Sequence, residues 1–263
     1  LSAPQAIPDH ATLADYLRTE TPAAGFKTNT PKWMVSLLKA FYGPNATPEN
    51  EFGYHYIPKH NKDSSHIAIF EAMYDEEIEG AIFFGTNPMV GGPDTNKEHR
   101  ALMKLKWLVV ADLWETETAA FWREQAGSNP AEIDTEVFFL PACSSYEKEG
   151  SITNSGRWMQ YRWQAIPPKG ASKADLEIVH LLARRLKETY KDSTNPIDEP
   201  MQALHWNYGE SDHPDIDLVQ RDINGYEVKT GKLVQNFTKL ADDGSTACGN
   251  WIYSGFYPEE GKN

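Results

Sequence analysis

The chain has 263 residues, of which 40% are hydrophobic and 24% charged, and its formal net charge is −13. These proportions are ordinary for a globular protein. No apolar run approaches the roughly 20 residues that span a bilayer, so we expect no direct membrane insertion. The acidic balance argues against a nucleic-acid partner, because binding to a phosphate backbone depends on clustered Lys and Arg. The acidic net charge is still compatible with an anionic nucleotide cofactor, since loop amides bind phosphate without a net positive charge.

The sequence of residues 1–64 predicts a segment of helix and loops that lies outside the core. Thr30 and Pro31 suit the start of a helix, and its apolar positions repeat until a stop at Gly43. The loops around this helix are rich in Pro and Asn. This segment is therefore expected to pack on the core of the protein rather than to form a second nucleotide fold.

Three histidines cluster at the end of that excursion. His55, His60 and His66 lie near Glu51 and Asp63, which raises the question of a metal site. Their spacing fits neither one face of a helix nor the alternation of a strand. Ordinary loop histidines are therefore favoured over a metal site.

Short apolar runs alternate with helical patterns in the middle of the chain. The runs cover residues 81–84, 108–111 and 137–140, and helical patterns lie between them at 95–105 and 118–125. Short apolar runs bounded by turn formers are typical of buried strands. Strand and helix alternating in this way predict adjacent parallel strands whose carboxyl ends lie on the same side.

One more helix is predicted after Pro167-Pro168, with Ser172 as its cap and apolar positions that run to Tyr190. Residues 65–190 are therefore expected to form an α/β domain. We expect a three-layer, Rossmann-like parallel sheet with helices on both faces. Irregular insertions would extend it at both ends.

The loop Gly85-Thr-Asn-Pro88 follows the first predicted strand. Open α/β sheets bind ligands at the carboxyl ends of their strands. Gly85 allows the backbone to come close to a ligand. Thr86 and Asn87 offer side-chain hydrogen bonds, and Pro88 fixes the direction in which the chain leaves.

Asp112 ends the second predicted strand and has two possible roles. Its carboxylate could accept hydrogen bonds from both N1–H and the exocyclic amine of a guanine. Alternatively, Asp112 or Glu115 could cap the helix predicted over 118–125. Both roles stay open, because capping and ligand binding can share one loop.

Residues 191–263 predict loops and a β-ribbon. Asn224-Gly225 is a hairpin signal that precedes the ribbon. Earlier in the chain, the aromatic segment 158–163 is expected to be a packed strand rather than a platform for stacking bases. Long flanks with little regular structure suggest surfaces that pack on something else.

Cys143 and Cys248 are too few for a four-thiolate cluster, and neither lies in a CxxC pattern. Two unpaired thiols are favoured over a disulfide, although the sequence leaves the pairing open. The chain has no Ser-His-Asp order, no P-loop and no full glycine fingerprint of a nicotinamide-binding fold.

Three segments together resemble one family. The Gly85 loop, residues 107–118 and residues 139–157 look like the third domain of molybdopterin oxidoreductases of the dimethyl-sulfoxide-reductase type. In that family a strand ends in Gly-x-Asn-Pro, the next ends in Asp-x-x-x-Thr, and a Leu-Pro…Glu-x-Glu-Gly-x-x-x-Asn segment leads to an Arg. The match covers about residues 65–190.

The flanking segments narrow the resemblance. Residues 29–33, 39–43, 51–54 and 242–254 look like the catalytic subunit of respiratory and periplasmic formate dehydrogenases. That subunit also carries a four-cysteine motif, a selenocysteine or cysteine metal ligand, and a catalytic His and Arg. None of these motifs is identifiable in the present sequence. The chain therefore resembles an internal piece of a longer subunit, with no catalytic or metal-ligating residue of its own.

The resemblance implies a bis-molybdopterin guanine dinucleotide cofactor with tungsten or molybdenum, and a 4Fe-4S cluster elsewhere in the subunit. It implies cofactor contacts at ten positions: Gly85, Thr86, Asn87, Pro88, Asp112, Thr116, Glu149, Gly150, Asn154 and Arg157. The first four would approach the pyrophosphate or ribose of the cofactor. Asp112 and Thr116 would contact its guanosine. The last four would form a third wall of the cofactor-binding site.

The implied partners are the remainder of the catalytic subunit, an iron–sulfur electron-transfer subunit and the substrate formate. The implied location is the periplasm, in anaerobic respiration. Two alternatives stay open: a piece of a sibling oxidoreductase with another small substrate, and a free-standing nucleotide-binding module without catalysis.

Overall fold

The computed structural model describes residues 5–124, 127–154, 156 and 158–259, and the chain divides into two compact units. The sheet unit comprises Lys62–Ser151 and Arg162–Ile178. The helical unit comprises Leu1–Asn61, Ile152–Tyr161 and Val179–Asn263. Segments from the two ends of the sequence therefore share one unit, and the middle of the chain forms the other.

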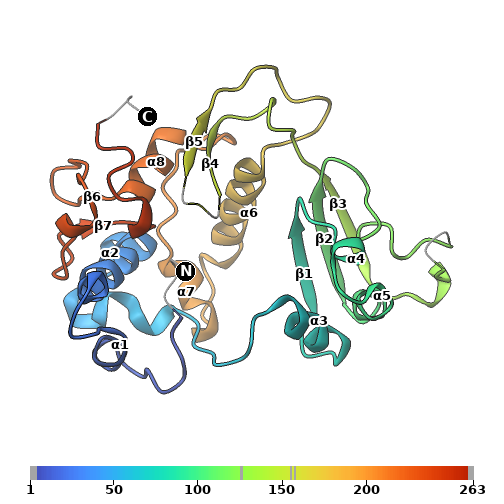
Figure 1. Ribbon diagram of the computed structural model, residues 1–263, viewed down its shortest axis with the longest axis horizontal. Coiled ribbons are helices and arrows are strands. Elements are labelled where there is room, and N and C mark those ends of the chain that lie inside the picture. Colours follow the sequence, from blue (N-terminus) through green and yellow to red (C-terminus); the bar gives the residue numbers. More distant parts are fainter. Residues whose placement is uncertain (1–4, 125–126, 155, 157, 260–263) are drawn as a thin grey trace. The chain divides into compact units, whose positions relative to one another are not determined.

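The sheet unit is built on three parallel strands: β1 (Gly80–Phe84), β2 (Trp107–Asp112) and β3 (Glu136–Pro141), in the order β1-β2-β3 (Figure 1). Both neighbouring pairs are parallel. The three predicted strands, their adjacency and their common direction are confirmed. All three carboxyl ends lie at one edge of the sheet, where the loops predicted to bind a ligand begin.

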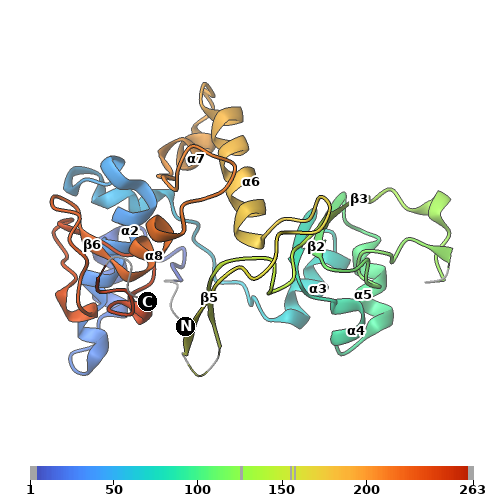
Figure 2. The ribbon, with the colours of Figure 1, turned by 90° about the horizontal axis from the view of Figure 1, so that it is seen from above.

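Helices α3 (His66–Tyr74), α4 (Pro88–Gly91) and α5 (Thr95–Leu102) lie on the same side of this sheet (Figure 2). Together they bury one apolar core, whose members are Phe70, Met73, Met89, Ala101, Leu102, Leu105, Leu108, Val110, Ala119 and Phe121. Burying a large apolar side chain contributes about 1.5–3 kcal/mol, so this shared core holds the layer on the sheet. The α/β fold class is confirmed.

The opposite face of the sheet is exposed. Ile82, Phe84, Trp107 and Phe138 show 36–45% of their surface to solvent. Helices were expected on both faces, but in the described part of the sheet unit only one face has a helical layer. The path from β1 to β2 to β3 runs in one direction, and right-handed crossovers in one direction place their helices on one face.

The helix predicted over 118–125 does not form, and the described residues of this stretch are turns. Thr118 and Phe121 are both completely buried. The Thr118 amide and hydroxyl bond to the side chain of Asn87 on the neighbouring loop. These tertiary contacts outweigh a helix propensity that amounts to a few tenths of a kcal/mol per residue.

Other helix boundaries differ slightly from those predicted. Helix α5 ends at Leu102 rather than at residue 105, and the Asp94 carboxylate caps its start by accepting from the Lys97 amide. Ser172 does not cap the helix that follows it, because its hydroxyl donates to the Lys169 carbonyl. That helix, α6 (Asp175–Tyr190), is otherwise confirmed, and its first residues belong to the sheet unit.

The helical unit contains the remaining helices: α1 (Leu13–Glu20), α2 (Thr30–Tyr42), α7 (Glu199–Ala203) and α8 (Ile216–Asn224). The short strands are β4 (Gly150–Thr153), β5 (Met159–Arg162), β6 (Tyr226–Glu227) and β7 (Thr246–Ala247). Strand β4 pairs with β5, and β6 pairs with β7. No helix of the described chain is long and apolar enough to cross a bilayer.

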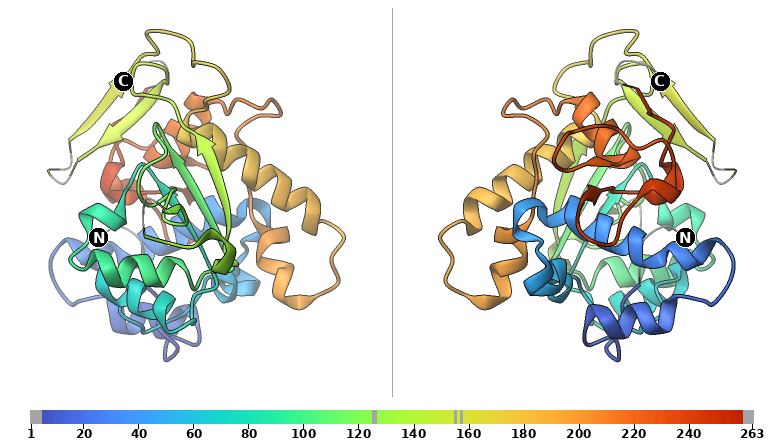
Figure 3. Two further views of the ribbon diagram at one scale, coloured as in Figure 1. Left: turned by 90° about the vertical axis from the view of Figure 1, so that its right-hand side faces the viewer. Right: turned by 90° about the vertical axis from the view of Figure 1, so that its left-hand side faces the viewer.

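Helix α2 is tied to the C-terminal segment, and the two lie side by side (Figure 3). The Ser36 and Thr246 hydroxyls are 2.8 Å apart in a buried position. The Cys248 amide donates to the Ser36 carbonyl at 2.9 Å. The rings of Trp33 and Trp251 stack with centroids 3.5 Å apart and planes 3° from parallel. The N-terminal helix predicted from Thr30 is confirmed, and it packs on a partner from the far end of the sequence.

The hairpin predicted at Asn224-Gly225 is wrong, because these residues end helix α8. Gly225 has a φ of 92° and its amide donates to the Arg221 carbonyl, which closes the last turn. Asn224 is completely buried, and its side-chain oxygen accepts from the amides of Gly255 and Tyr257. A residue so occupied has no freedom to form a two-residue turn. In the segment that follows, Tyr226–Glu227 forms the short strand β6, which pairs with β7.

The strand predicted over 158–163 is confirmed as β5. The expected packing of its aromatic side chains is not confirmed, since Trp158 and Trp163 are each 71% exposed.

Gly225 offers a test of how tightly the end of α8 is packed. A Cβ at this position would lie 2.9 Å from Cys248 Cβ and 3.1 Å from the Ala247 carbonyl oxygen. Gly225→Ala therefore adds overpacking, worth roughly 1–3 kcal/mol, to the cost of a left-handed residue. Gly231 also has a positive φ, 72°, but open space around its Cβ position. Gly231→Ala should cost only about 1 kcal/mol in the free energy of unfolding.

Urea unfolding followed by circular dichroism would compare the two variants with the parent chain. Equal losses of stability in both variants would show that the close contacts around Gly225 relax without cost.

Candidate functional site

The loops that follow β1 and β2 meet at the carboxyl edge of the sheet. The Gly85 amide donates to the Ala111 carbonyl at 2.9 Å, which extends the β1–β2 ladder into the first loop. Asp112 follows Ala111 directly. The structure therefore brings the Gly85–Pro88 loop and Asp112 together, as the parallel sheet requires.

Gly85 is open to an approaching ligand. Its φ is 56°, and nothing lies within 4 Å of the position that a Cβ would occupy. Thr86, the next residue, is exposed, and Pro88 is buried. The first two residues of the loop thus face solvent while its end is anchored in the core.

Asn87 joins the two loops. Its side-chain oxygen accepts from the Thr118 hydroxyl at 2.7 Å and from the Thr118 amide at 3.2 Å. Its side-chain nitrogen donates to Glu117 Oε2 at 2.6 Å. Hydrogen bonds from its own amide and from Asn87 lower the pKa of the Glu117 carboxyl. Both ends of the Asn87 amide are engaged within the protein, so this residue positions the loops.

Asp112 is half-buried, and its Oδ1 accepts from the amide of Leu113 at 2.7 Å. Its second oxygen has no hydrogen bond among the described residues. Glu115 forms a bidentate pair with the Arg123 guanidinium at 2.5 and 2.6 Å. Neither carboxylate caps a helix, because the described residues here form turns. The capping role considered for Asp112 is therefore wrong.

Thr116 carries the most unusual polar group of this edge. Its side-chain hydroxyl is buried and has no hydrogen-bond partner among the described residues. Leaving such a group unpaired costs about 1–3 kcal/mol, so native proteins seldom retain one without a reason. Thr116 follows Asp112 by four positions, in the loop after β2.

The structure does not join the other predicted contacts to this edge. Glu149 and Gly150 lie in the sheet unit at the start of β4, and Gly150 has open space around its Cβ position. Asn154 belongs to the helical unit, where its side-chain oxygen accepts from the amides of Gly156 and Trp158. It shapes the turn between β4 and β5. Arg157 lies outside the described residues.

Sequence reasoning missed Glu117 and Thr118, which complete the link to Asn87. The signal that could have found them is the Thr116-Glu-Thr triplet, which puts three hydrogen-bonding side chains after a strand. Thr118 was instead assigned to the start of a helix.

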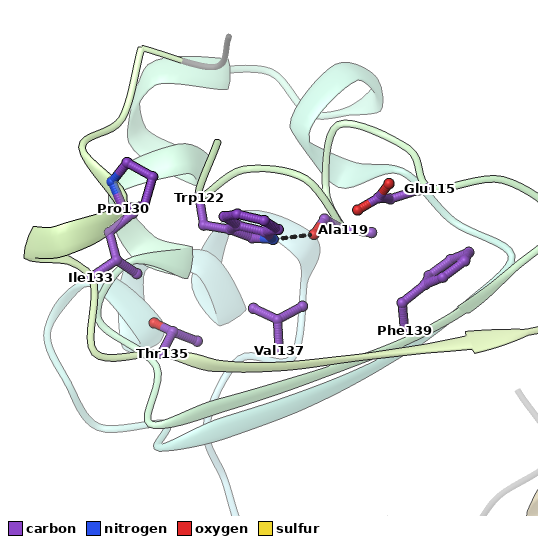
Figure 4. A pocket seen from close by; sticks show the side chains of 8 residues that line it. All are labelled: Glu115, Ala119, Trp122, Pro130, Ile133, Thr135, Val137 and Phe139. Carbon is purple, nitrogen blue, oxygen red and sulfur yellow. Dashed lines mark hydrogen bonds between the residues drawn. The ribbon is translucent and has the colours of Figure 1, made fainter. Parts of the chain in front are cut away.

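A pocket of about 300 Å³ lies beside β3, in the space left by the missing helix. The Trp122 ring lies above Val137, with Glu115 and Phe139 toward one end and Pro130 and Ile133 toward the other (Figure 4). The indole N–H of Trp122 donates to the Ala119 carbonyl at 3.1 Å. The lining is mainly apolar and its carboxylate is already paired, so this pocket does not suit the phosphates of a nucleotide.

The predicted cluster of His55, His60 and His66 does not form a metal site among the described residues. His66 Nε2 lies 2.9 Å from Glu98 Oε1, and Glu98 is only 3% exposed. The ring of His55 packs against Tyr56. Among the described residues no group of three or more His, Cys, Asp or Glu could hold a metal ion.

The two cysteines are free and buried. Burial raises the pKa of the Cys143 thiol, and it raises the pKa of Cys248 to about 11. Both thiols therefore stay protonated at neutral pH and are poor nucleophiles.

The two residues of the Gly85–Pro88 loop that carry polar side chains should respond differently to truncation. Asn87→Ala leaves the buried Thr118 hydroxyl and amide without their acceptor, so unfolding should become easier by roughly 1–3 kcal/mol. Thr86→Ala removes an exposed side chain and should change stability by less than about 0.5 kcal/mol. Thermal and urea unfolding of both variants would measure the difference. A silent Asn87→Ala variant would show that the link between the loops contributes nothing to the fold.

The model of the molybdopterin oxidoreductase family matches residues 134–185. The chain is 40% identical to formate dehydrogenase 2 subunit alpha (cytochrome c-553) of Nitratidesulfovibrio vulgaris, over 96% of the chain and 26% of the relative. It is 38% identical to the major subunit of the nitrate-inducible formate dehydrogenase of Escherichia coli, over 95% and 27%. With formate dehydrogenase subunit alpha of Megalodesulfovibrio gigas it shares 35% identity, over 95% and 26%. The chain spans about a quarter of the length of these curated relatives.

Proposed function

Because the chain belongs to the molybdopterin oxidoreductase family, we propose that its β1–β2 edge holds the guanosine end of a molybdopterin guanine dinucleotide in a formate dehydrogenase. The family match supports a molybdopterin cofactor, and the relatives' names supply formate. The observation that carries the proposal is the buried, unpaired hydroxyl of Thr116, in the same loop as Asp112. A site that awaits a polar ligand leaves a group of this kind unsatisfied.

The donors and acceptors at this edge fit a guanine. Its Watson–Crick edge offers two neighbouring N–H donors, which match a carboxylate that still has a free oxygen. Asp112 supplies that carboxylate, and the Thr116 hydroxyl can donate to an acceptor or accept from a further N–H. The open backbone at Gly85 allows a ribose or a planar base to approach without a steric clash.

The charges at this edge are less suited to phosphates. Asp112, Glu115 and Glu117 are all acidic, and only Glu115 has a guanidinium partner, Arg123, among the described residues. We therefore assign the edge to the uncharged guanosine end. The pyrophosphate would be neutralised elsewhere, with Arg157 as the cation suggested by the family resemblance.

In the intact enzyme these residues would bind and orient the cofactor. When bound, the molybdenum or tungsten bis-pterin group supplies the two-electron chemistry that converts formate to carbon dioxide. Asp112 and Thr116 would fix the far end of the cofactor, and the Asn87–Thr118 link would keep the two loops in register. The relatives' names, which call them alpha or major subunits, support further subunits. The iron–sulfur path for electrons and the periplasmic location are proposed from the family resemblance alone.

Substitution of Thr116 tests whether its hydroxyl serves ligand binding or the fold, because the two roles predict changes of opposite sign in stability. Thr116→Val removes an unpaired buried hydroxyl, so the 263-residue chain should keep its stability or gain about 1 kcal/mol. The same change in the intact enzyme should lower the guanine-nucleotide content. Thr118→Val is the matched control, because the buried Thr118 hydroxyl is hydrogen-bonded and its loss should destabilise both proteins.

Guanine released from purified enzyme by acid hydrolysis, measured beside thermal unfolding, would read out both effects. A Thr116→Val variant with full cofactor content would remove this hydroxyl from the binding site.

Asp112 should also act on the cofactor rather than on the fold. Asp112→Asn places an amide donor against a guanine donor, which costs roughly 1–3 kcal/mol of binding, or about 5- to 150-fold in cofactor affinity. Glu115→Gln is the control, since that carboxylate is already paired with Arg123. Guanine and metal content, with formate oxidation by the same samples, would compare the two variants. Normal cofactor content in Asp112→Asn would contradict the proposed guanine contact.

A further inference from the structure

A segment without helix or strand, residues 204–215, joins α7 to α8 in the helical unit and lies across one face of α6 (Figure 1). We call this segment the strap. Three side chains of α6 form hydrogen bonds with carbonyl groups of the strap, and they follow one another at i, i+4 and i+7 spacing: His180, Arg184 and Lys187. Residues at this spacing share one face of a helix. A single face of α6 therefore holds the strap in place.

His180 is completely buried, and both of its ring nitrogens are engaged. The indole N–H of Trp206 can only donate, so Nδ1 of His180 accepts from it at 3.0 Å. Nε2 therefore carries the one proton of the neutral ring, and it donates to the Ser211 carbonyl at 3.0 Å. The two strap residues thus select one neutral tautomer of this histidine.

Two aromatic residues continue the connection from α6 to α8. The ring of Trp206 meets that of Tyr208 edge to face, with centroids 4.9 Å apart. The Tyr208 hydroxyl donates to Asp222 Oδ2 on α8 at 2.6 Å. The Tyr208 carbonyl accepts from the Asp215 amide at 2.8 Å, which closes the strap just before α8 begins. The strap therefore ties the two helices together.

A second proton on the His180 ring does not fit this arrangement. Nδ1 would become a donor that faces the Trp206 donor, at a position from which water is excluded. The ring would also add a third positive charge to those of Arg184 and Lys187 on the same face of α6. Histidine is the side chain whose charge ordinarily changes between about pH 5 and 8. Acid should therefore break the bond between His180 and Trp206.

The carboxylates around the strap do not supply a counter-charge of the same strength. Asp212 is exposed and lies 3.3 Å from the Arg184 guanidinium. Glu177, one turn earlier on α6, pairs with Lys173. Glu210 is exposed to solvent, as is the strap's other acid-sensitive ring beyond it, that of His213.

Asp222 acts in the opposite direction. Burial raises the pKa of its carboxyl, and the hydrogen bond from Tyr208 offsets part of that rise. A carboxyl with a raised pKa binds its proton more readily in the closed structure, so its contribution to stability grows as the pH falls. The acid sensitivity of the strap therefore does not come from Asp222.

His205, near the start of the strap, acts in the same direction as His180. Burial lowers the pKa of its imidazole, and the positive charges of Lys187, Arg221 and Lys39 lower it further. A histidine with a lowered pKa stabilises the folded state when neutral, and this contribution is lost as the pH falls. The two histidines have to be separated by substitution.

We infer that the strap is an acid-sensitive latch, closed while the His180 ring is neutral and opened when that ring takes up a second proton. Opening would withdraw Trp206 from α6 and Tyr208 from Asp222, which would free α8 from α6. The inference concerns the helical unit alone and does not rest on the proposed function.

Exchange of the Trp206 indole proton reports on the latch, and NMR of the 263-residue chain with isotope-labelled tryptophan measures it. The Trp122 indole, which donates to a backbone carbonyl, is the internal reference for the intrinsic effect of pH on exchange. As the pH falls from about 8 to 5, the rate for Trp206 relative to Trp122 should rise by up to about tenfold per pH unit, since opening takes up one proton.

Three variants identify the group that titrates. His180→Gln keeps a side-chain donor for the Ser211 carbonyl and does not titrate, so the rise should disappear. His205→Gln and Asp222→Asn are the matched controls, and the rise should persist in both. A rate ratio that stays constant in the unsubstituted chain would overturn the inference without any variant. A rise that persists in His180→Gln, or that disappears in His205→Gln, would overturn it as well.

Discussion

The hydrogen bonds between Asn87 and Thr118 hold the carboxyl edge of the sheet together. They link the loop after β1 to the loop after β2, and both groups of Thr118 that take part are shielded from water. Asn87 satisfies the Thr118 amide, and the described residues that follow Thr118 form turns rather than a regular helix. The turns that replace the helix leave the Thr116 hydroxyl buried without a partner among the described residues and open the pocket beside β3. One side-chain amide thus fixes the loop after β1 to the loop after β2.

The contact between Asn87 and Thr118 also separates structural residues from ligand-binding residues at this edge. Asn87 and Thr118 satisfy each other, so they serve the fold. Asp112 and Thr116 each keep a hydrogen-bonding group that the described part of the protein leaves unused, and those groups are what a ligand can recognise. A site built in this way separates the residues that set the geometry from those that bind. Changes to the first pair should alter stability, and changes to the second pair should alter ligand affinity.

The strands could be predicted because their signal is local. The run Leu108-Val-Val-Ala111 in β2 is identified as a buried strand without any knowledge of its neighbours in space. The Thr118 and Asn224 assignments failed because a distant partner decides the conformation of each. Thr118 bonds to Asn87, and Asn224 to the amides of Gly255 and Tyr257. The position of Asp112 at the sheet edge was predictable from the strand pattern, whereas the unpaired state of Thr116 depends on three-dimensional packing.

The link between Ser36 and Thr246 has a consequence for synthesis of the protein. The two residues are 210 positions apart. At roughly 5–20 residues per second, a ribosome needs about 10–40 s to make the second residue after the first. During that interval the surface of α2 that carries Trp33 has no Trp251 to stack on. The nascent chain therefore presents an apolar helix to the folding machinery of the cell long before its partner exists, which makes this helix a natural target for a chaperone.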